Sequence, residues 1–307
     1  MIKRLCIYVL SAVLLCTFIG CAAPAAHTGI SIVCANFPAY DFLREITAGS
    51  EEITLTLLLK AGQESHDYDP SSKDIAAIHA ADIFVYGGGI SDGWIDNVLS
   101  SVDTTDKTVI ALTSLVPPLA TAHDHQDGLH QEVYDEHVHT APANAITIAS
   151  ALADAVYAKV ADSTLYYENT ATFIANLQAL DADFKATVAA AENPTIVMAD
   201  RFPLAYFCKA YGITYHAAFA GCSASVEPSS GTVQTLINTV QTQALPIVFQ
   251  SELSDGKLAK TVADATGAQV RTLYACHNIS KTDFDNGEGY LSLMRKNLAV
   301  LKEAWSV

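Results

Sequence analysis

The sequence predicts an α/β protein built as two parallel-sheet lobes that one long bridging helix joins. Three observations carry this prediction. Short apolar runs alternate with helix-forming stretches in the first half of the chain, the same alternation returns in the second half, and an almost unbroken helix-forming stretch, 144–192, separates the two. Repeated strand–helix–strand order is typical of parallel sheets, because a connection between parallel strands needs a crossover helix.

The chain begins with a stretch typical of an export signal. Lys3 and Arg4 precede an uncharged run, 5–19, that ends in small residues. This run is shorter than the roughly 20 apolar residues that span a bilayer. We expect residues 1–20 to be a signal peptide. Residues 18–21 resemble the lipobox of bacterial lipoproteins, with Phe18 where Leu is usual, and Cys21 would then carry the lipid anchor.

The N-terminal lobe is expected over residues 21–160. Apolar runs predict strands at 30–35, 53–59, 83–86 and 108–112, and the stretches between them predict helices at 39–48, 73–81 and 94–100. The connection 121–139 is rich in histidine and acidic residues, and we expect it to be a loop.

The bridging helix is expected within residues 161–192. Apolar residues recur at three- and four-residue spacing from Phe173 to Val188, and Asp162 and Ser163 form a cap signal. These patterns predict one helix from about residue 164 to residue 191. A helix of this length spans about 42 Å at 1.5 Å per residue, which makes it a stiff strut.

The C-terminal lobe is expected over residues 193–307. Its predicted strands are 195–199, 213–216, 247–250 and 269–273, and its predicted helices are 204–210, 232–243, 257–266 and 289–305. Open parallel sheets bind ligands at the carboxyl ends of their strands. The sequence therefore predicts a ligand site between the lobes.

Composition and cysteine usage limit the function classes. Lys and Arg number 17 against 33 Asp and Glu, and the resulting charge of −16 argues against nucleic-acid binding and favours cations. An apolar fraction of 50% is enough for two cores. Export permits disulfides, but Cys34 and Cys208 lie in apolar runs, which favours free buried thiols over pairing with Cys222 or Cys276.

Histidine is concentrated in the acidic connection of the N-terminal lobe. Five of the ten histidines fall within seventeen positions, namely His123, His125, His130, His137 and His139. Neutral imidazole is a preferred ligand for zinc and the later first-row metals. Such patches are also typical of loops with low metal affinity, so we expect His123, His125, His130 and His139 to be auxiliary.

Three histidines occupy loops at the ends of predicted elements. His66 follows the strand that ends near residue 59, His137 precedes a helix, and His277 follows the last strand. Loops of this kind from two lobes can converge on one metal ion. The alternative for each histidine is an ordinary loop residue.

The order of several motifs resembles the metal-binding lipoproteins of ABC importers for zinc and manganese. These motifs are the run 62–71 with His66 and Pro70, the run Asp-Glu-His-Val at 135–138, and the run 289–297. The resemblance covers nearly the whole mature chain and implies a bilobed receptor anchored outside the cytoplasmic membrane, whose partner is an importer permease. It also implies that His66 and His137 are metal ligands, and His277 stands where the family commonly has a carboxylate ligand.

One position departs from the family pattern. Arg201 stands where the third ligand, His or Glu, is usual, and arginine cannot ligate because it stays protonated. Asp200, Glu252 and Glu227 are the candidates for a replacement. A structural ion pair between Asp200 and Arg201 is the alternative.

A ligand set rich in imidazole favours tetrahedral Zn²⁺, whereas Mn²⁺ prefers more oxygen ligands. We therefore expect a monomeric zinc receptor without catalytic activity, and a manganese receptor is the main rival. A metallohydrolase would need a general base placed as in His-Glu-x-x-His, a motif that the sequence lacks. An adhesin with a structural metal would leave the bilobed pattern unexplained.

Overall fold

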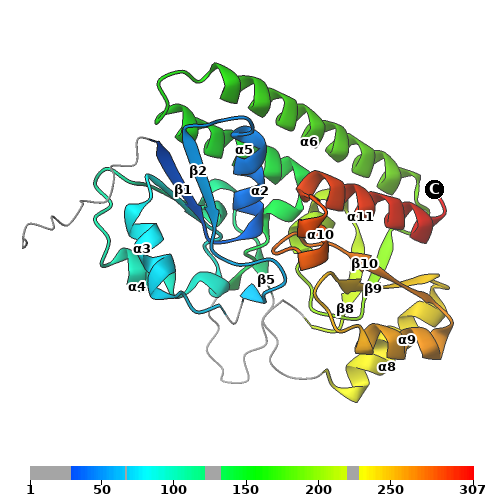
Figure 1. The fold of residues 1–307 in the computed structure, drawn as a ribbon. Coiled ribbons are helices and arrows are strands. Elements are labelled where there is room, and N and C mark those ends of the chain that lie inside the picture. The colour runs from blue at the N-terminus through cyan, green and yellow to red at the C-terminus, as the bar shows by residue number, and fades with distance from the viewer. Residues whose placement is uncertain (1–28, 66–67, 122–132, 220–227) are drawn as a thin grey trace, which may run out of the picture.

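The computed structural model describes residues 29–65, 68–121, 133–219 and 228–307, and each half of them forms a four-stranded parallel sheet (Figure 1). The first sheet has the order β2-β1-β3-β4 and the second has the order β10-β9-β7-β8. Numbered within its own lobe, each sheet has the strand order 2-1-3-4. The predicted fold class, two parallel-sheet α/β lobes with a long helix, is confirmed. The strands of the two sheets are β1 (Ile30–Cys34), β2 (Ile53–Leu57), β3 (Ile83–Tyr86), β4 (Thr108–Ala111), β7 (Thr195–Met198), β8 (Thr214–Ala217), β9 (Ile247–Ser251) and β10 (Gln269–Leu273).

Helices cover both faces of the N-terminal sheet. Alternate residues of β1 enter different cores: Ile32 and Cys34 pack with α2 (Phe37–Ile46) and α5 (Pro142–Tyr157), whereas Val33 packs with α3 (Ser72–Ala80) and α4 (Ile95–Leu99). This two-residue alternation is the strand periodicity that places successive side chains on opposite faces. The sheet is therefore the middle of three layers.

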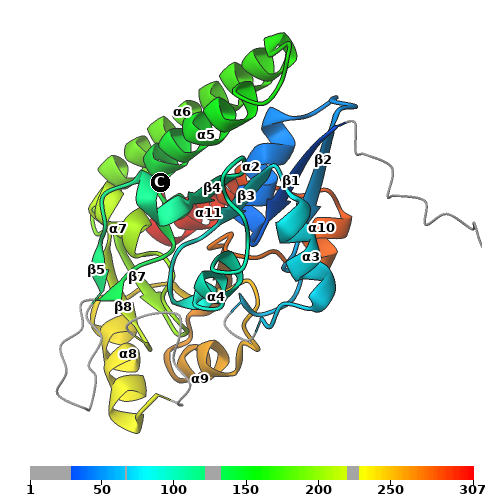
Figure 2. The ribbon, with the colours of Figure 1, turned by 90° about the vertical axis from the view of Figure 1, so that its left-hand side faces the viewer.

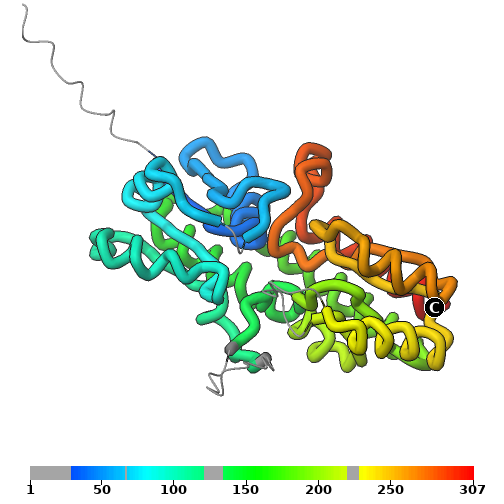
Figure 3. Tube along the Cα trace, turned by 90° about the horizontal axis from the view of Figure 1, so that it is seen from below, coloured from blue at the N-terminus to red at the C-terminus, as the bar shows by residue number. Residues whose placement is uncertain are grey.

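The C-terminal sheet repeats this arrangement. Val197 of β7 packs on the outer face with α8 (Ser230–Thr242) and α9 (Lys257–Thr266), while Ile196 and Met198 face the inner core with α7 (Ala205–Tyr211) and α11 (Tyr290–Trp305). Figure 2 shows α8 and α9 together on the side of this lobe away from the strut. Figure 3, from below, shows the two lobes side by side.

The long helix α6 (Thr164–Ala190) is the strut. It packs against α2 and α5 of the N-terminal lobe and against α7 and α11 of the C-terminal lobe (Figure 1). Its 27 residues correspond to about 40 Å. The helix begins where the sequence predicts, because Asp162 Oδ1 accepts a hydrogen bond from Thr164 N at 2.9 Å.

One apolar core runs through both lobes. Phe42 of α2 makes edge-to-face contacts with Phe173 of α6 and with Tyr290 of α11, at ring-centroid distances of 5.3 and 5.0 Å. Further along α6, Phe184 contacts Phe207 of α7 at 4.9 Å. Close-packed cores resist deformation, so the shared core opposes a large rotation of one lobe against the other.

Several short elements were not predicted. They are η2 (Ile90–Asp92), η3 (Leu112–Leu115), the antiparallel pair β5 (Ala120–Thr121) and β6 (Val133–Tyr134), η4 (Val138–Thr140) and α10 (Lys281–Asp285). Elements of two to five residues are too short to show a hydrophobic period. The pair β5 and β6 brackets residues 122–132 and places η4 directly after it.

Three cysteines, Cys34, Cys208 and Cys276, are free and buried. Cys222, the expected signal peptide and Cys21 lie outside the described residues. Over the described ranges, no helix combines the length and the apolar character that a bilayer crossing requires.

Candidate metal centre

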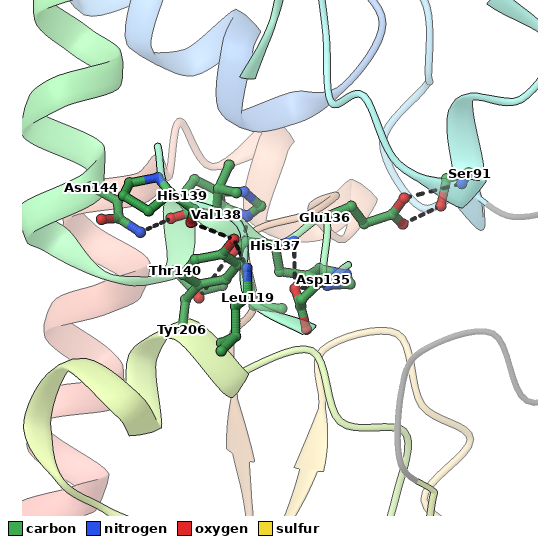
Figure 4. A network of polar contacts seen from close by, with 12 residues as sticks. Ser91, Leu119, Asp135, Glu136, His137, Val138, His139, Thr140, Asn144 and Tyr206 are labelled. Carbon is green, nitrogen blue, oxygen red and sulfur yellow. Dashed lines mark hydrogen bonds and ion pairs between the residues drawn. The ribbon is translucent and has the colours of Figure 1, made fainter. Parts of the chain in front are cut away.

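His137 is held in place by its neighbour Asp135 (Figure 4). Both residues are buried, with exposed fractions of 3% and 6%. Asp135 Oδ1 accepts a hydrogen bond from His137 N at 2.6 Å and lies 3.0 Å from His137 Nδ1. A carboxylate on Nδ1 favours the tautomer whose lone pair is on Nε2, as in many metal-bound histidines.

His277 approaches His137 from the other lobe. The two ring centroids are 4.8 Å apart. The loop that carries His277 turns through Cys276, whose φ of 56° is in the left-handed region that is uncommon outside glycine. Glu252 supports this turn, because its carboxylate accepts hydrogen bonds from Ala275 N at 3.0 Å and from Cys276 N at 2.9 Å.

The same loop is tied to the N-terminal lobe. Asn278 Nδ2 donates to Lys60 O at 3.0 Å and to Gln63 O at 2.6 Å, and Gly62 N donates to Ile279 O at 2.7 Å. The segment 60–63 leads directly to His66, which lies outside the described residues. The backbone before His66 and the backbone around His277 are therefore held side by side.

Glu136 completes a cluster with the two histidines. One potential ligand atom from each of Glu136, His137 and His277 lies within 4.8 Å of the others. Ser91 donates to the Glu136 carboxylate through its backbone N at 3.0 Å and through its hydroxyl. Burial acts to raise the pKa of Glu136, but the neighbouring imidazoles of His277 and His137 and the bonds from Ser91 outweigh it and hold the pKa below its usual value.

Sequence reasoning missed Glu136 as a candidate ligand. The available signal was its place beside His137 in the Asp-Glu-His run. Its distance to His277, however, depends on the tertiary fold.

A small cavity opens beside the two histidines. Its volume is about 60 Å³, and its lining includes Glu64, Ser65, His137, Arg201, Glu252 and His277. A small cavity lined by imidazole and carboxylate groups can hold a metal ion.

Of the three candidate carboxylates, Glu252 lines this cavity and Asp200 does not. Asp200 Oδ2 accepts from Ser251 N and from Ser251 Oγ at 2.9 and 2.8 Å, and its Oδ1 accepts from Arg201 N at 2.8 Å. Burial raises the pKa of Glu252 to about 7, although the backbone N–H groups it accepts from lower it. The Arg201 guanidinium pairs with Glu64 at 3.0 Å.

His139 does not lie where the sequence predicted. The sequence grouped it with the loop histidines, but it lies in η4 with an exposed fraction of 1%. Its Nε2 is 2.9 Å from Ala275 O, and burial, with the neighbouring His277 and His137, holds its pKa well below the usual value. His139 therefore lies in the protein core rather than in the loop, and its role as an auxiliary metal ligand stays a prediction. The other loop histidines, His123, His125 and His130, lie outside the described residues, as does Glu227.

Two α/β lobes on one helical strut, with imidazole and carboxylate groups gathered around a small cavity between them, define the bilobed substrate-binding class of transport proteins. Residues 32–304 match the family described as zinc-uptake complex component A, periplasmic, and the chain belongs to this family.

Zinc-binding relatives agree with this assignment. The zinc-binding lipoprotein AdcA of Streptococcus pneumoniae is 29% identical over 281 residues, which cover 89% of this chain and 55% of AdcA. The high-affinity zinc uptake system protein ZnuA of Bacillus subtilis is 27% identical over 282 residues, covering 90% of this chain and 87% of ZnuA. The chain thus spans about half the length of the AdcA relatives.

A solved structure of the same shape is the Zn(II)-bound ZnuA-like domain of Streptococcus pneumoniae AdcA. The match has a TM-score of 0.75 at 27% identity and covers 91% of this chain and 100% of that domain.

Proposed function

We propose that the protein captures Zn²⁺ between its lobes outside the cytoplasmic membrane and delivers it to an ABC importer. The observation that carries this proposal is the approach of His137 and His277 from different lobes, with ring centroids 4.8 Å apart and Glu136 beside them. Imidazole nitrogen with a carboxylate oxygen is a typical zinc ligand set. The names of the zinc-binding relatives support the same metal.

The proposed ligands are His137, His277, Glu136 and His66. Zinc in proteins is almost always four-coordinate when no reaction needs an open position. His66 is included because the backbone that leads to it is tied to the His277 loop through Asn278. Four protein ligands would exclude water from the ion.

Asp200 and Glu252 are reserve ligands in this proposal. Glu252 is the stronger of the two, since it lines the cavity and Asp200 does not. A bound cation would favour the ionised form of Glu252, whose pKa burial raises to about 7.

The remaining parts of the chain follow from this role. We infer a signal peptide at 1–20, a lipid anchor at Cys21, lobes at 21–160 and 193–307, and a bridging segment at 161–192. His123, His125 and His130 would hold zinc weakly near the cavity. A receptor of this kind acts as a monomer and performs no catalysis, because capture and release need neither a nucleophile nor a general base.

The test is a metal competition on untagged protein. Protein dialysed against a buffered mixture of Zn²⁺ and Mn²⁺ should retain one tightly bound zinc per chain by elemental analysis. Preferential retention of manganese would overturn the choice of metal. Retention of neither metal would overturn the receptor function.

A further inference from the structure

A charge pair crosses the metal cavity between the lobes. Arg201 follows β7 of the C-terminal lobe, and Glu64 lies in the loop after β2 of the N-terminal lobe. Arg201 Nη1 and Glu64 Oε2 are 3.0 Å apart, and their side chains are 37% and 42% exposed. Both residues line the cavity together with His137 and His277.

The position of Arg201 is unfavourable for a cation. A guanidinium remains protonated in proteins, so a fixed positive charge lines the space that would receive Zn²⁺. Like charges near a protein surface repel one another with an energy that falls with distance and with salt. Glu64 offsets this repulsion, because its carboxylate neutralises the guanidinium at close range.

We propose that Arg201 weakens metal binding and accelerates metal release. Glu64 limits both effects of Arg201 by neutralising its charge. This inference rests on the proposed function. A receptor must surrender its ion to the importer, and a positive charge at the cavity shortens the lifetime of the bound state without removing a ligand. The pair thereby tunes affinity from outside the coordination shell.

Holding the lobes together is a smaller part of what this pair does. Exposed ion pairs contribute little to stability, since water screens both groups. The lobes are joined by the hydrogen bonds of Asn278 to Lys60 O and Gln63 O and by the core around Phe42 and Tyr290. The pair therefore acts on the ion more than on closure.

The experiment measures zinc dissociation into excess chelator by stopped flow, together with the competitive Kd, at low and high ionic strength. Arg201→Gln should slow release, and Glu64→Gln should accelerate it, each by roughly 3- to 10-fold at low salt. The double variant should return close to wild type. Arg201→Lys, which keeps the charge, should also stay close to wild type.

The matched control is the pair between Arg271 Nη2 and Glu303 Oε1. These atoms are 2.6 Å apart, the side chains are 34% and 44% exposed, and neither residue lines the cavity. Arg271→Gln and Glu303→Gln should leave zinc release unchanged.

Three results would overturn the inference. Faster release from both Arg201→Gln and Glu64→Gln would assign the pair to closure of the lobes. Unchanged rates in both would assign it no role, and an Arg201→Lys variant that behaves as Arg201→Gln would exclude charge as the cause. Wild-type protein that holds no zinc would contradict the proposed function, whereas tight binding with unchanged variants contradicts this inference alone.

Discussion

Replacing Asp135 with Ala should weaken zinc binding although Asp135 is not among the proposed ligands. Its Oδ1 accepts from His137 N at 2.6 Å and lies 3.0 Å from His137 Nδ1. The second contact orients the imidazole and raises the basicity of the nitrogen that faces the metal. Without the carboxylate, the ring can rotate and change tautomer.

The expected loss of zinc affinity follows from treating the two hydrogen bonds of Asp135 separately. A hydrogen bond to a charged group contributes about 1.5–3 kcal/mol. The backbone bond is present with and without metal, so it cancels from the binding free energy, whereas the ring bond strengthens when the metal binds. One such bond corresponds to a loss of roughly 10- to 100-fold in affinity, which is the usual effect of removing a carboxylate behind a metal-bound histidine.

The assay is a competitive chelator titration at constant pH, with urea denaturation to measure stability. Asp82→Ala is the control, because Asp82 Oδ2 also accepts a backbone hydrogen bond, from Ser31 N at 2.8 Å, but at the start of β1. Asp82→Ala should lower stability and leave zinc affinity unchanged. If Asp135→Ala binds zinc as tightly as wild type, Asp135 does not orient the ligand.

Burial raises the pKa of Asp41 from 3.8 to about 6, so the folded state loses stability as pH rises through this window. Asp41→Asn keeps an oxygen that can accept the hydrogen bond from Tyr290 N. In urea denaturation, the stability of this variant relative to wild type should increase as pH rises from 4 to 7, by up to about 3 kcal/mol. A stability difference between the two proteins that is the same at pH 4 and at pH 7 would contradict this. His139→Ala should lower the unfolding free energy by about 2–4 kcal/mol through lost packing and the lost bond to Ala275 O, and a loss of zinc affinity as large as that of a ligand variant would instead make His139 a ligand. Deleting residues 122–131 should remove weak zinc equivalents in equilibrium dialysis and leave one tight site, and loss of the tight site would assign that site to the loop.

Periodicity was sufficient to predict the sheets and the strut, because both depend on local patterns that repeat over many residues. The helix after β1 shows the limit of this approach. We predicted 39–48, but α2 runs Phe37–Ile46, since Asn36 Oδ1 caps it by accepting from Ala39 N at 3.2 Å and Pro38 occupies its first turn. This cap was readable, and the apolar pattern alone placed the helix two residues late.

The site was less predictable, because its geometry comes from contacts between distant segments. Glu64 and Arg201 are 137 residues apart in sequence, and no spacing rule connects them. His139 was misplaced because composition groups all five nearby histidines, whereas burial depends on what packs above them. The left-handed φ of Cys276, beside His277, likewise requires a tertiary partner, Glu252, that the sequence does not reveal.

The central claim is that His137 and His277 share one metal ion between the lobes, and zinc titration of their alanine variants against a competing chelator tests it most directly. His79, exposed near the end of α3, provides the control variant. The account predicts that His137→Ala and His277→Ala each lose orders of magnitude in zinc affinity, because each removes a ligand, while His79→Ala binds as wild type does. Wild-type affinity in both His137→Ala and His277→Ala would show that the ion does not bind at this site.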